Sequence, residues 1–368
     1  MKNYSTTNYK HVLTALSVVG MLLFFTNPLY GQWPFNEKHN NLPSDKFMPE
    51  KDWTKGQYQK FYRWREGILQ KQMDDDDDPQ LMRRQKAILN GNKITAEIWN
   101  YGSISSPGNR VTDIVWEGLG YGYEFGPFIC AEVEVAPNSH LDAYIKTDED
   151  GNPVINDEGD TVWVAKVISD GIVSLGGEVS PDGKEIWGCQ PLAYNVEGVP
   201  YADPASSYIP TSNVLDRDGD GKPDSWPEEW YNENIKEFVW PGALRQGASN
   251  SDMESFFVVD DRTNKEFEYY PFPDDSTHKG LGIEIESRYY QWANPLAEDI
   301  IFLIYKVTNK SDKDLNKVMF GMWGDPHVGG PSNWQDDLSY FDRDINMVYC
   351  WDEDGISDVS GRPPGYFG

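Results

Sequence analysis

The sequence contains little cysteine and little positive charge, and each shortage excludes a class of protein. Cys130, Cys189 and Cys350 are the only cysteines in 368 residues, so a disulfide framework and CxxC metal sites are excluded. They are expected to be buried small hydrophobic residues, or at most one bridge and a free thiol. The 60 Asp and Glu outnumber the 32 Lys and Arg, and a net charge of −28 repels nucleic acid. We therefore expect no nucleic-acid partner.

Motifs of the common catalytic machineries are also missing. The sequence has no nucleophile elbow, HExxH, Walker loop or Rossmann fingerprint. No Lys-Ser/Thr pair follows the glycine-rich stretch L-G-Y-G-Y-E-F-G-P that begins at Leu119, so it is not a phosphate loop, and we expect it to join two strands within 111–135. A glycosidase needs only two carboxylates about 5–10 Å apart in an aromatic-lined cleft. Polysaccharide cleavage therefore stays open, without a catalytic residue that can be named.

An apolar run close to the N-terminus predicts export. Lys2 and Lys10 precede the run from Val12 to Phe25, and the small residue Gly31 follows it. This order is typical of a secretory signal peptide, and the run is too short to span a membrane comfortably. We expect a protein that is secreted or held at the outer cell surface after cleavage near Gly31, and not an integral membrane protein.

The abundant residues are aromatic, and they favour β-structure. Aromatic residues make up 14% of the chain, and flat side chains pack well on a pleated sheet. Ile94, Ala96 and Ile98 alternate with other residues, and turn residues recur about every ten positions from there onward. This pattern predicts a mainly β protein, a β-sandwich or a multi-sheet domain, after a short helical N-terminal segment.

The predicted organisation has five parts. After the signal peptide (1–31) come an N-terminal arm with short helices and an acidic linker (32–91), a first β region (92–210), a calcium loop with an aromatic connector (211–250) and a second β region (251–368). Helices are expected over 52–72 and 80–89, separated by the run of aspartates at 74–78. The strongest strand predictions are 255–261, 282–290 and 300–308. The last of these is nearly all apolar and is expected to be a central strand, joined as a hairpin to 317–323.

The most specific motif is D-R-D-G-D-G-K-P-D, from Asp216 to Asp224. Alternate carboxylates on a tightly turned loop can supply several of the roughly six to eight oxygen ligands that Ca²⁺ takes. Gly221 permits the positive φ that turns such a loop back on itself. The sequence therefore predicts a calcium site in this loop.

This motif resembles the calcium loops of bacterial thrombospondin type 3-like repeats and, more distantly, dockerin and EF-hand loops. Pro227 stands where an EF-hand has its bidentate Glu, so the resemblance implies a single structural calcium and not a switch. The ligands that it implies are the carbonyl of Lys222 and the side chains of Asp216, Asp218, Asp220 and Asp224. Glu228, or a residue from elsewhere in the chain, would complete the site.

A weaker second cation site is expected around W-G-D-P-H-V-G-G. Asp325 and His327 lie in this stretch, ahead of Asp336 and Asp337, and such a cluster suits calcium or a transition metal. The alternative is a turn in which Asp-Pro and Gly-Gly only shape the backbone and bind no ion.

Residues 251–368 resemble a family of uncharacterised secreted β-rich proteins of Bacteroidetes-type bacteria associated with type IX secretion. The strings that carry this resemblance are S-D-M-E-S-F-F-V-V-D-D-R, K-G-L-G-I-E-I-E-S-R-Y-Y-Q-W, L-A-E-D-I-I-F-L-I-Y-K-V-T-N and F-G-M-W-G-D-P-H-V-G-G. The resemblance implies export and β-architecture. The closing G-R-P-P-G-Y-F-G contains no sorting domain, which is consistent with a piece of a longer protein.

The function expected from the sequence is that of a calcium-binding β module with a structural or adhesive role. Its partners would be calcium and extracellular glycans or surface proteins. The alternative is an extracellular polysaccharide-binding or polysaccharide-degrading protein that uses exposed aromatic platforms, of which Trp226, Trp230 and Trp334 are the candidates.

Overall fold

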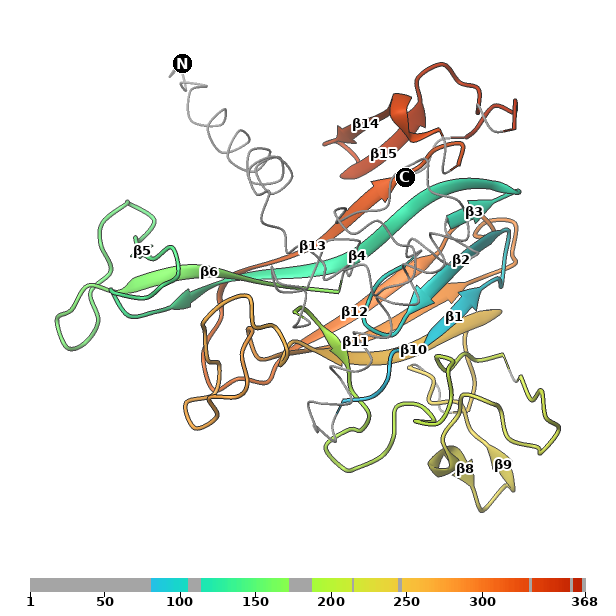
Figure 1. The fold of residues 1–368 in the computed structure, drawn as a ribbon, viewed down its shortest axis with the longest axis horizontal. Helices are drawn as coiled ribbons and strands as arrows, with labels where there is room; N and C mark the ends of the chain where they lie inside the picture. The colour runs from blue at the N-terminus through green and yellow to red at the C-terminus, as the bar shows by residue number, and fades with distance from the viewer. Residues whose placement is uncertain are drawn as a thin grey trace, which may run out of the picture.

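The computed structural model describes residues 81–104, 114–171, 187–213, 215–243, 247–330, 333–357 and 360–365. The predicted signal peptide, the 52–72 helix and the aspartate run lie outside these residues. Within them the chain is mainly β, as predicted, and it forms two large antiparallel sheets and two small ones (Figure 1).

The larger sheet has seven strands. Six are in the order β1-β2-β3-β4-β6-β5, and the seventh, β13, also pairs with β4. Figure 1 shows β13, β4 and β6 running side by side along the molecule. The strands are β1 (Lys86–Leu89), β2 (Ile94–Trp99), β3 (Ile114–Trp116), β4 (Leu119–Glu134), β5 (Tyr144–Ile145), β6 (Trp163–Asp170) and β13 (Asn316–Pro326).

The second sheet has four strands in the order β12-β11-β10-β7. It packs on the first sheet through alternate residues such as Ile98 and Ile129 from one sheet and Phe257 and Ile285 from the other, all in one buried cluster. This arrangement is sandwich-like. The strands are β7 (Gln190–Pro191), β10 (Met253–Asp260), β11 (Ile283–Gln291) and β12 (Phe302–Asn309).

A tryptophan cluster covers the outer face of the four-stranded sheet. Trp226, Trp230 and Trp240 pack with Phe256 and Val258 of β10, so β10 is buried on both faces. The segment that carries this cluster includes the 3₁₀ turn Glu228–Trp230 and the short strands β8 (Tyr231–Asn232) and β9 (Glu237–Phe238), drawn beyond β10 in Figure 1.

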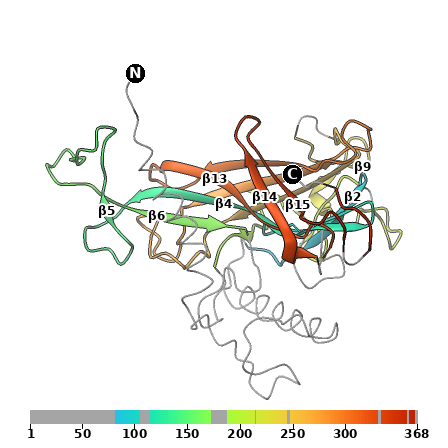
Figure 2. The ribbon, with the colours of Figure 1, turned by 90° about the horizontal axis from the view of Figure 1, so that it is seen from above.

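A hairpin of β14 (Asp337–Asp342) and β15 (Met347–Asp352) follows the 3₁₀ turn Trp334–Asp336. Figure 2 shows this hairpin crossing the direction of β13 and β4. Cys350 of β15 packs with Leu119, Tyr121 and Val328 in a small cluster of its own. All three cysteines are free, and Cys189 and Cys350 are buried as expected, whereas Cys130 is only partly buried.

Several strand predictions are confirmed and others are wrong. Strands at 255–261, 282–290, 300–308 and 317–323 are all present, within two to three residues of the expected bounds. The predicted helix over 80–89 is wrong, because Ala87 and Leu89 alternate into the core and residues 86–89 pair with β2. The glycine-rich stretch does not join two strands but lies inside β4, and the chain turns at Glu117 and Gly118 instead.

Two pairing predictions are also wrong. The apolar β12 is an edge strand of its sheet, and it pairs with β11 alone among the described strands. β13 does not pair back on β12 but crosses to the other sheet, where it pairs with β4. The regions 92–210 and 251–368 therefore contribute strands to one sheet and residues to one core.

Candidate metal centre

Three of the four predicted aspartates converge. Carboxylate oxygens of Asp216, Asp218 and Asp224 lie within 4.8 Å of one another, a spacing at which they could hold one cation. The carboxylate of Asp220 is outside this group and accepts the backbone N–H of Lys222 at 2.8 Å. Three of the four predicted side-chain ligands therefore lie close enough together to share one ion, and the carboxylate of Asp220 does not join them.

Glycine and aspartate together hold the loop in this shape. Gly219 and Gly221 have φ angles of +77° and +89°, which only glycine adopts without strain. Their N–H groups donate to the two carboxylate oxygens of Asp216, at 2.6 Å and 3.0 Å. Asp216 is therefore fixed by the backbone that surrounds it, with its carboxylate facing the inside of the loop.

Arg217 holds the third carboxylate of the group. Its backbone N–H donates to Asp224 at 2.9 Å, and its guanidinium forms an ion pair with the other oxygen of Asp224. The backbone hydrogen bond and the guanidinium together lower the pKa of Asp224. The carboxylate is therefore ionised over the whole physiological range, and a bound cation would share it with Arg217.

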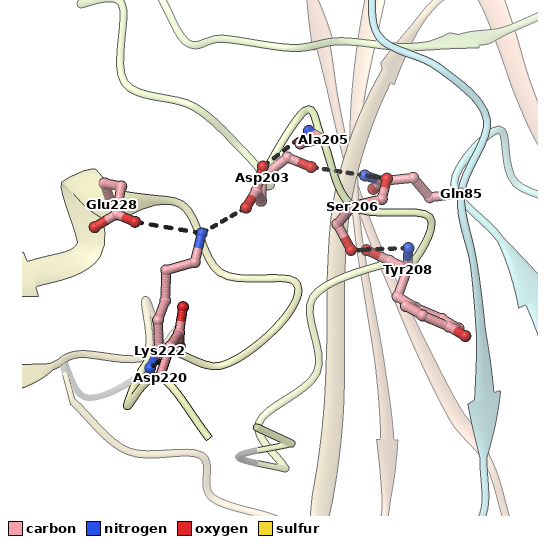
Figure 3. Close-up of polar contacts among 8 residues, drawn as sticks. All are labelled: Gln85, Asp203, Ala205, Ser206, Tyr208, Asp220, Lys222 and Glu228. Carbon is pink, nitrogen blue, oxygen red and sulfur yellow. Dashed lines mark hydrogen bonds and ion pairs between the residues drawn. The ribbon is translucent and has the colours of Figure 1, made fainter. Parts of the chain in front are cut away.

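Lys222 fastens the loop to the body of the protein (Figure 3). Its ammonium group lies 2.5 Å from Asp203 and 3.5 Å from Glu228. Gln85, next to β1, donates to the carbonyl groups of Asp203 and Ser206, and this links the loop to the larger sheet. Burial alone would lower the pKa of Lys222. The hydrogen bond to Asp203 and the negative charges of Asp203 and Glu228 raise it by more than burial lowers it, so the net shift of the pKa is upward.

The carboxylate of Glu228 therefore contacts Lys222, and it is not part of the convergent group. The sequence proposed Glu228 as the residue that completes the calcium site, whereas the structure places it in the anchor of the loop. It could complete the site only by leaving Lys222.

Tryptophan side chains hold the segment just after the loop. Trp226 is 3% exposed and donates its indole N–H to the carbonyl of Thr211, and Trp230 donates to the carbonyl of Pro200. Both are core residues, so the hypothesis that they form exposed sugar platforms is wrong for them. The side chain of Trp334 lies outside the described part of the structure.

The second predicted site has a different composition from the one expected. Of Asp325, His327, Asp336 and Asp337, only Asp336 belongs to a convergent carboxylate group, and its companions are Asp352 and Asp354. His327 stacks against the ring of Tyr123 at 4.6 Å. Asp337 accepts the N–H of Val328 at 3.0 Å, and burial raises its pKa to about 6.

Sequence analysis overlooked Asp352 and Asp354, although a signal was present. They lie in W-D-E-D-G, whose D-x-D-G order repeats the middle of the first loop. Asp352 is buried and accepts the N–H groups of Gly355 and Ile356. Hydrogen bonds within the turn account for this geometry.

Comparisons with known proteins do not add a family to these observations. No family model matches the chain, and neither the curated proteins nor the solved structures gave a match. Among the described residues, no helix is both long enough and apolar enough to cross a membrane.

Proposed function

We propose that this chain is an exported or cell-surface β module in which the Asp216–Asp224 loop binds one structural calcium ion. The observation that supports the proposal is the convergence of Asp216, Asp218 and Asp224 within 4.8 Å. Hard carboxylate oxygens are the ligands that Ca²⁺ prefers, and backbone carbonyls and water can complete its shell. The net charge of −28 adds a long-range attraction for cations.

The ion would have a structural role because of where the loop lies. The loop is linked to the larger sheet through Lys222, Asp203 and Gln85, and Trp226 immediately after it belongs to the cluster on the second sheet. A cation that neutralises the three carboxylates would remove their mutual repulsion and fix the loop against both sheets. We infer a scaffold or adhesive role on this basis.

Calcium titration of the purified chain after EDTA treatment tests the proposal. We expect one site by isothermal titration calorimetry. At a calcium concentration of a hundred times Kd, we expect about 2.7 kcal/mol of added stability, observed as a higher Tm. Asp216→Ala and Asp218→Ala should abolish binding, while Asp220→Ala should weaken it much less, because Asp220 lies outside the convergent group.

The matched control is Asp150→Ala in the exposed acidic turn at 148–160, which contains Asp and Gly but is outside both convergent groups. This variant should bind calcium like the parent chain. A Tm that does not respond to calcium in the parent chain, or an equal loss of binding in the Asp150→Ala and Asp218→Ala variants, would refute the calcium site.

A further inference from the structure

The two large sheets each end in a long edge strand on the same side of the sandwich. Among the described strands, β13 pairs only with β4, and β12 pairs only with β11. The two edges are adjacent, because the rings of Tyr305 in β12 and Phe320 in β13 lie 5.3 Å apart. These strands have 8 and 11 residues, so each leaves a long row of backbone N–H and C=O groups without a strand beside it.

The middle of the β13 edge, from Val318 to Gly324, lacks the protection that exposed edges normally have. Natural edge strands carry charges, proline or bulges that prevent another strand from pairing with them. From Val318 to Gly324 this strand has no charge and no proline, and its irregularities in register fall only at its two ends. Met319 is 57% exposed, Phe320 46% and Trp323 38%. An apolar edge of this kind is typical of a strand that forms hydrogen bonds with a further strand beside it.

We propose that the β13 edge pairs with β13 of a second copy of this chain, in antiparallel orientation about a two-fold axis at Gly321. In this register Lys317 of one copy, which lies in the irregularity that precedes Met319, comes close to Asp325 of the other, so the only two charges of the strand lie near charges of opposite sign. The apolar residues also meet each other, because Met319 lies opposite Trp323 and Phe320 lies opposite Met322. Such self-complementarity is what an isologous dimer interface requires.

Two details of the strand are compatible with this register. The ring of Phe128 in β4 occupies the space beside Gly321 where a side chain would lie, so no side chain projects from the strand at the proposed axis. The side chain of Lys317 is 64% exposed while its ammonium contacts Glu132 at 2.9 Å, so it can reach a second carboxylate from the surface. The adjacent β12 edge would lie near the same axis and enlarge the interface.

Charge opposes this association over longer distances. Each copy carries a net charge of −28, and two such copies repel until salt screens them, with a Debye length of about 10 Å at 0.1 M and about 3 Å at 1 M. We therefore expect the dimer to strengthen as the salt concentration rises, because apolar and backbone contacts dominate at the interface.

Light scattering coupled to size exclusion, in 0.1 M and 0.5 M NaCl, tests the proposal. We expect twice the monomer mass at the higher salt concentration. Lys317→Asp and Asp325→Lys should each give monomers, because like charges then face each other in both pairs. Mixing the two variants should restore a dimer, since each charge then meets its opposite across the interface.

A third variant separates loss of pairing from loss of folding. Met319→Glu changes a side chain that is more than half exposed, so the fold should tolerate it, yet it places a carboxylate against Trp323 of the other copy. It should be monomeric with an unchanged circular dichroism spectrum, and Leu296→Glu, at a residue that is 90% exposed and outside the edge, should remain dimeric.

The proposal is overturned by any of three results. These are a parent chain that is monomeric at both salt concentrations, a dimer that survives Met319→Glu, and two folded charge variants that stay monomeric when mixed.

Discussion

Arg217 would influence the affinity of the calcium site that we propose in the Asp216–Asp224 loop. Its guanidinium is a positive charge already placed on Asp224, and its backbone N–H holds the same carboxylate in position. The first contact competes with a metal ion, whereas the second orients the ligand for it. The guanidinium also lies 4.6 Å from the ring of Tyr208, so it has a second partner if a cation displaces it.

Replacing Arg217 with Gln should therefore increase calcium affinity. The exposed ion pair with Asp224 competes only weakly with the ion, so we expect a Kd by calorimetry that is lower by up to roughly fivefold. Lys236→Gln is the control, because Lys236 forms an exposed ion pair with Glu233 outside the loop. Weaker binding by the Arg217→Gln variant would mean that Arg217 supports the site and does not compete with the ion.

At the scale of elements, the sequence predicted what local chemistry determines. Hydrophobic patterning located β10, β11, β12 and β13 within three residues of their bounds, and the Asp-Gly spacing located a loop in which three of four aspartates converge. Pairing could not be predicted in the same way. The apolar run of β12 has the composition of a central strand, but its neighbours depend on where β13 goes, and β13 pairs with a strand almost two hundred positions earlier.

The tryptophans show the same limit of composition. An aromatic residue close to an acidic loop can be a binding platform or a packing residue, and the local sequence does not distinguish these two roles. Trp226 is a packing residue because β10 presents Phe256 and Val258 toward it, and that fact depends on the sheet and not on the local sequence. Glu228 likewise contacts Lys222 for a reason that only the folded loop provides.

Trp226→Ala should destabilise the protein by about 3–5 kcal/mol, because it removes a buried aromatic ring from a close-packed cluster and leaves its space empty. Urea unfolding followed by fluorescence or circular dichroism would measure this loss. Leu296→Ala, at a residue that is 90% exposed, is the matched control and should cost less than about 0.5 kcal/mol. A glycan-binding defect without loss of stability would instead return Trp226 to the role of a platform.

At the scale of the whole molecule, two adjacent buried carboxyl groups link stability to pH. Burial raises the pKa of Asp260 to about 7 and that of Asp261 to about 6. Asp261 joins distant parts of the fold, since it accepts the hydroxyl of Ser169 and the backbone N–H groups of Leu281, Gly282 and Ile283. Both groups bind a proton more tightly in the folded chain than in the unfolded chain.

The free energy of unfolding should therefore fall as the pH rises from about 4 to about 7. The contribution of each group is fully present below the unfolded pKa of 3.8 and is lost as the pH passes the folded value, on the order of 3 kcal/mol for Asp261. Urea unfolding in EDTA at pH 4.5, 6 and 7.5 measures this change. Asp261→Asn should flatten it, while Asp312→Asn in an exposed turn should not. A slope of the opposite sign would refute the assignment.

The crossing of β13 from one sheet to the other also determines when the molecule can fold. The long strand β4 obtains its second neighbour over residues 122–132 only when residues 316–326 arrive. A chain that emerges N-terminus first must therefore keep that strand half-paired until residues 316–326 have also emerged. Late closure of this kind slows folding, and in the exported protein proposed above it would keep at least the first 326 residues from closing the sandwich during transport.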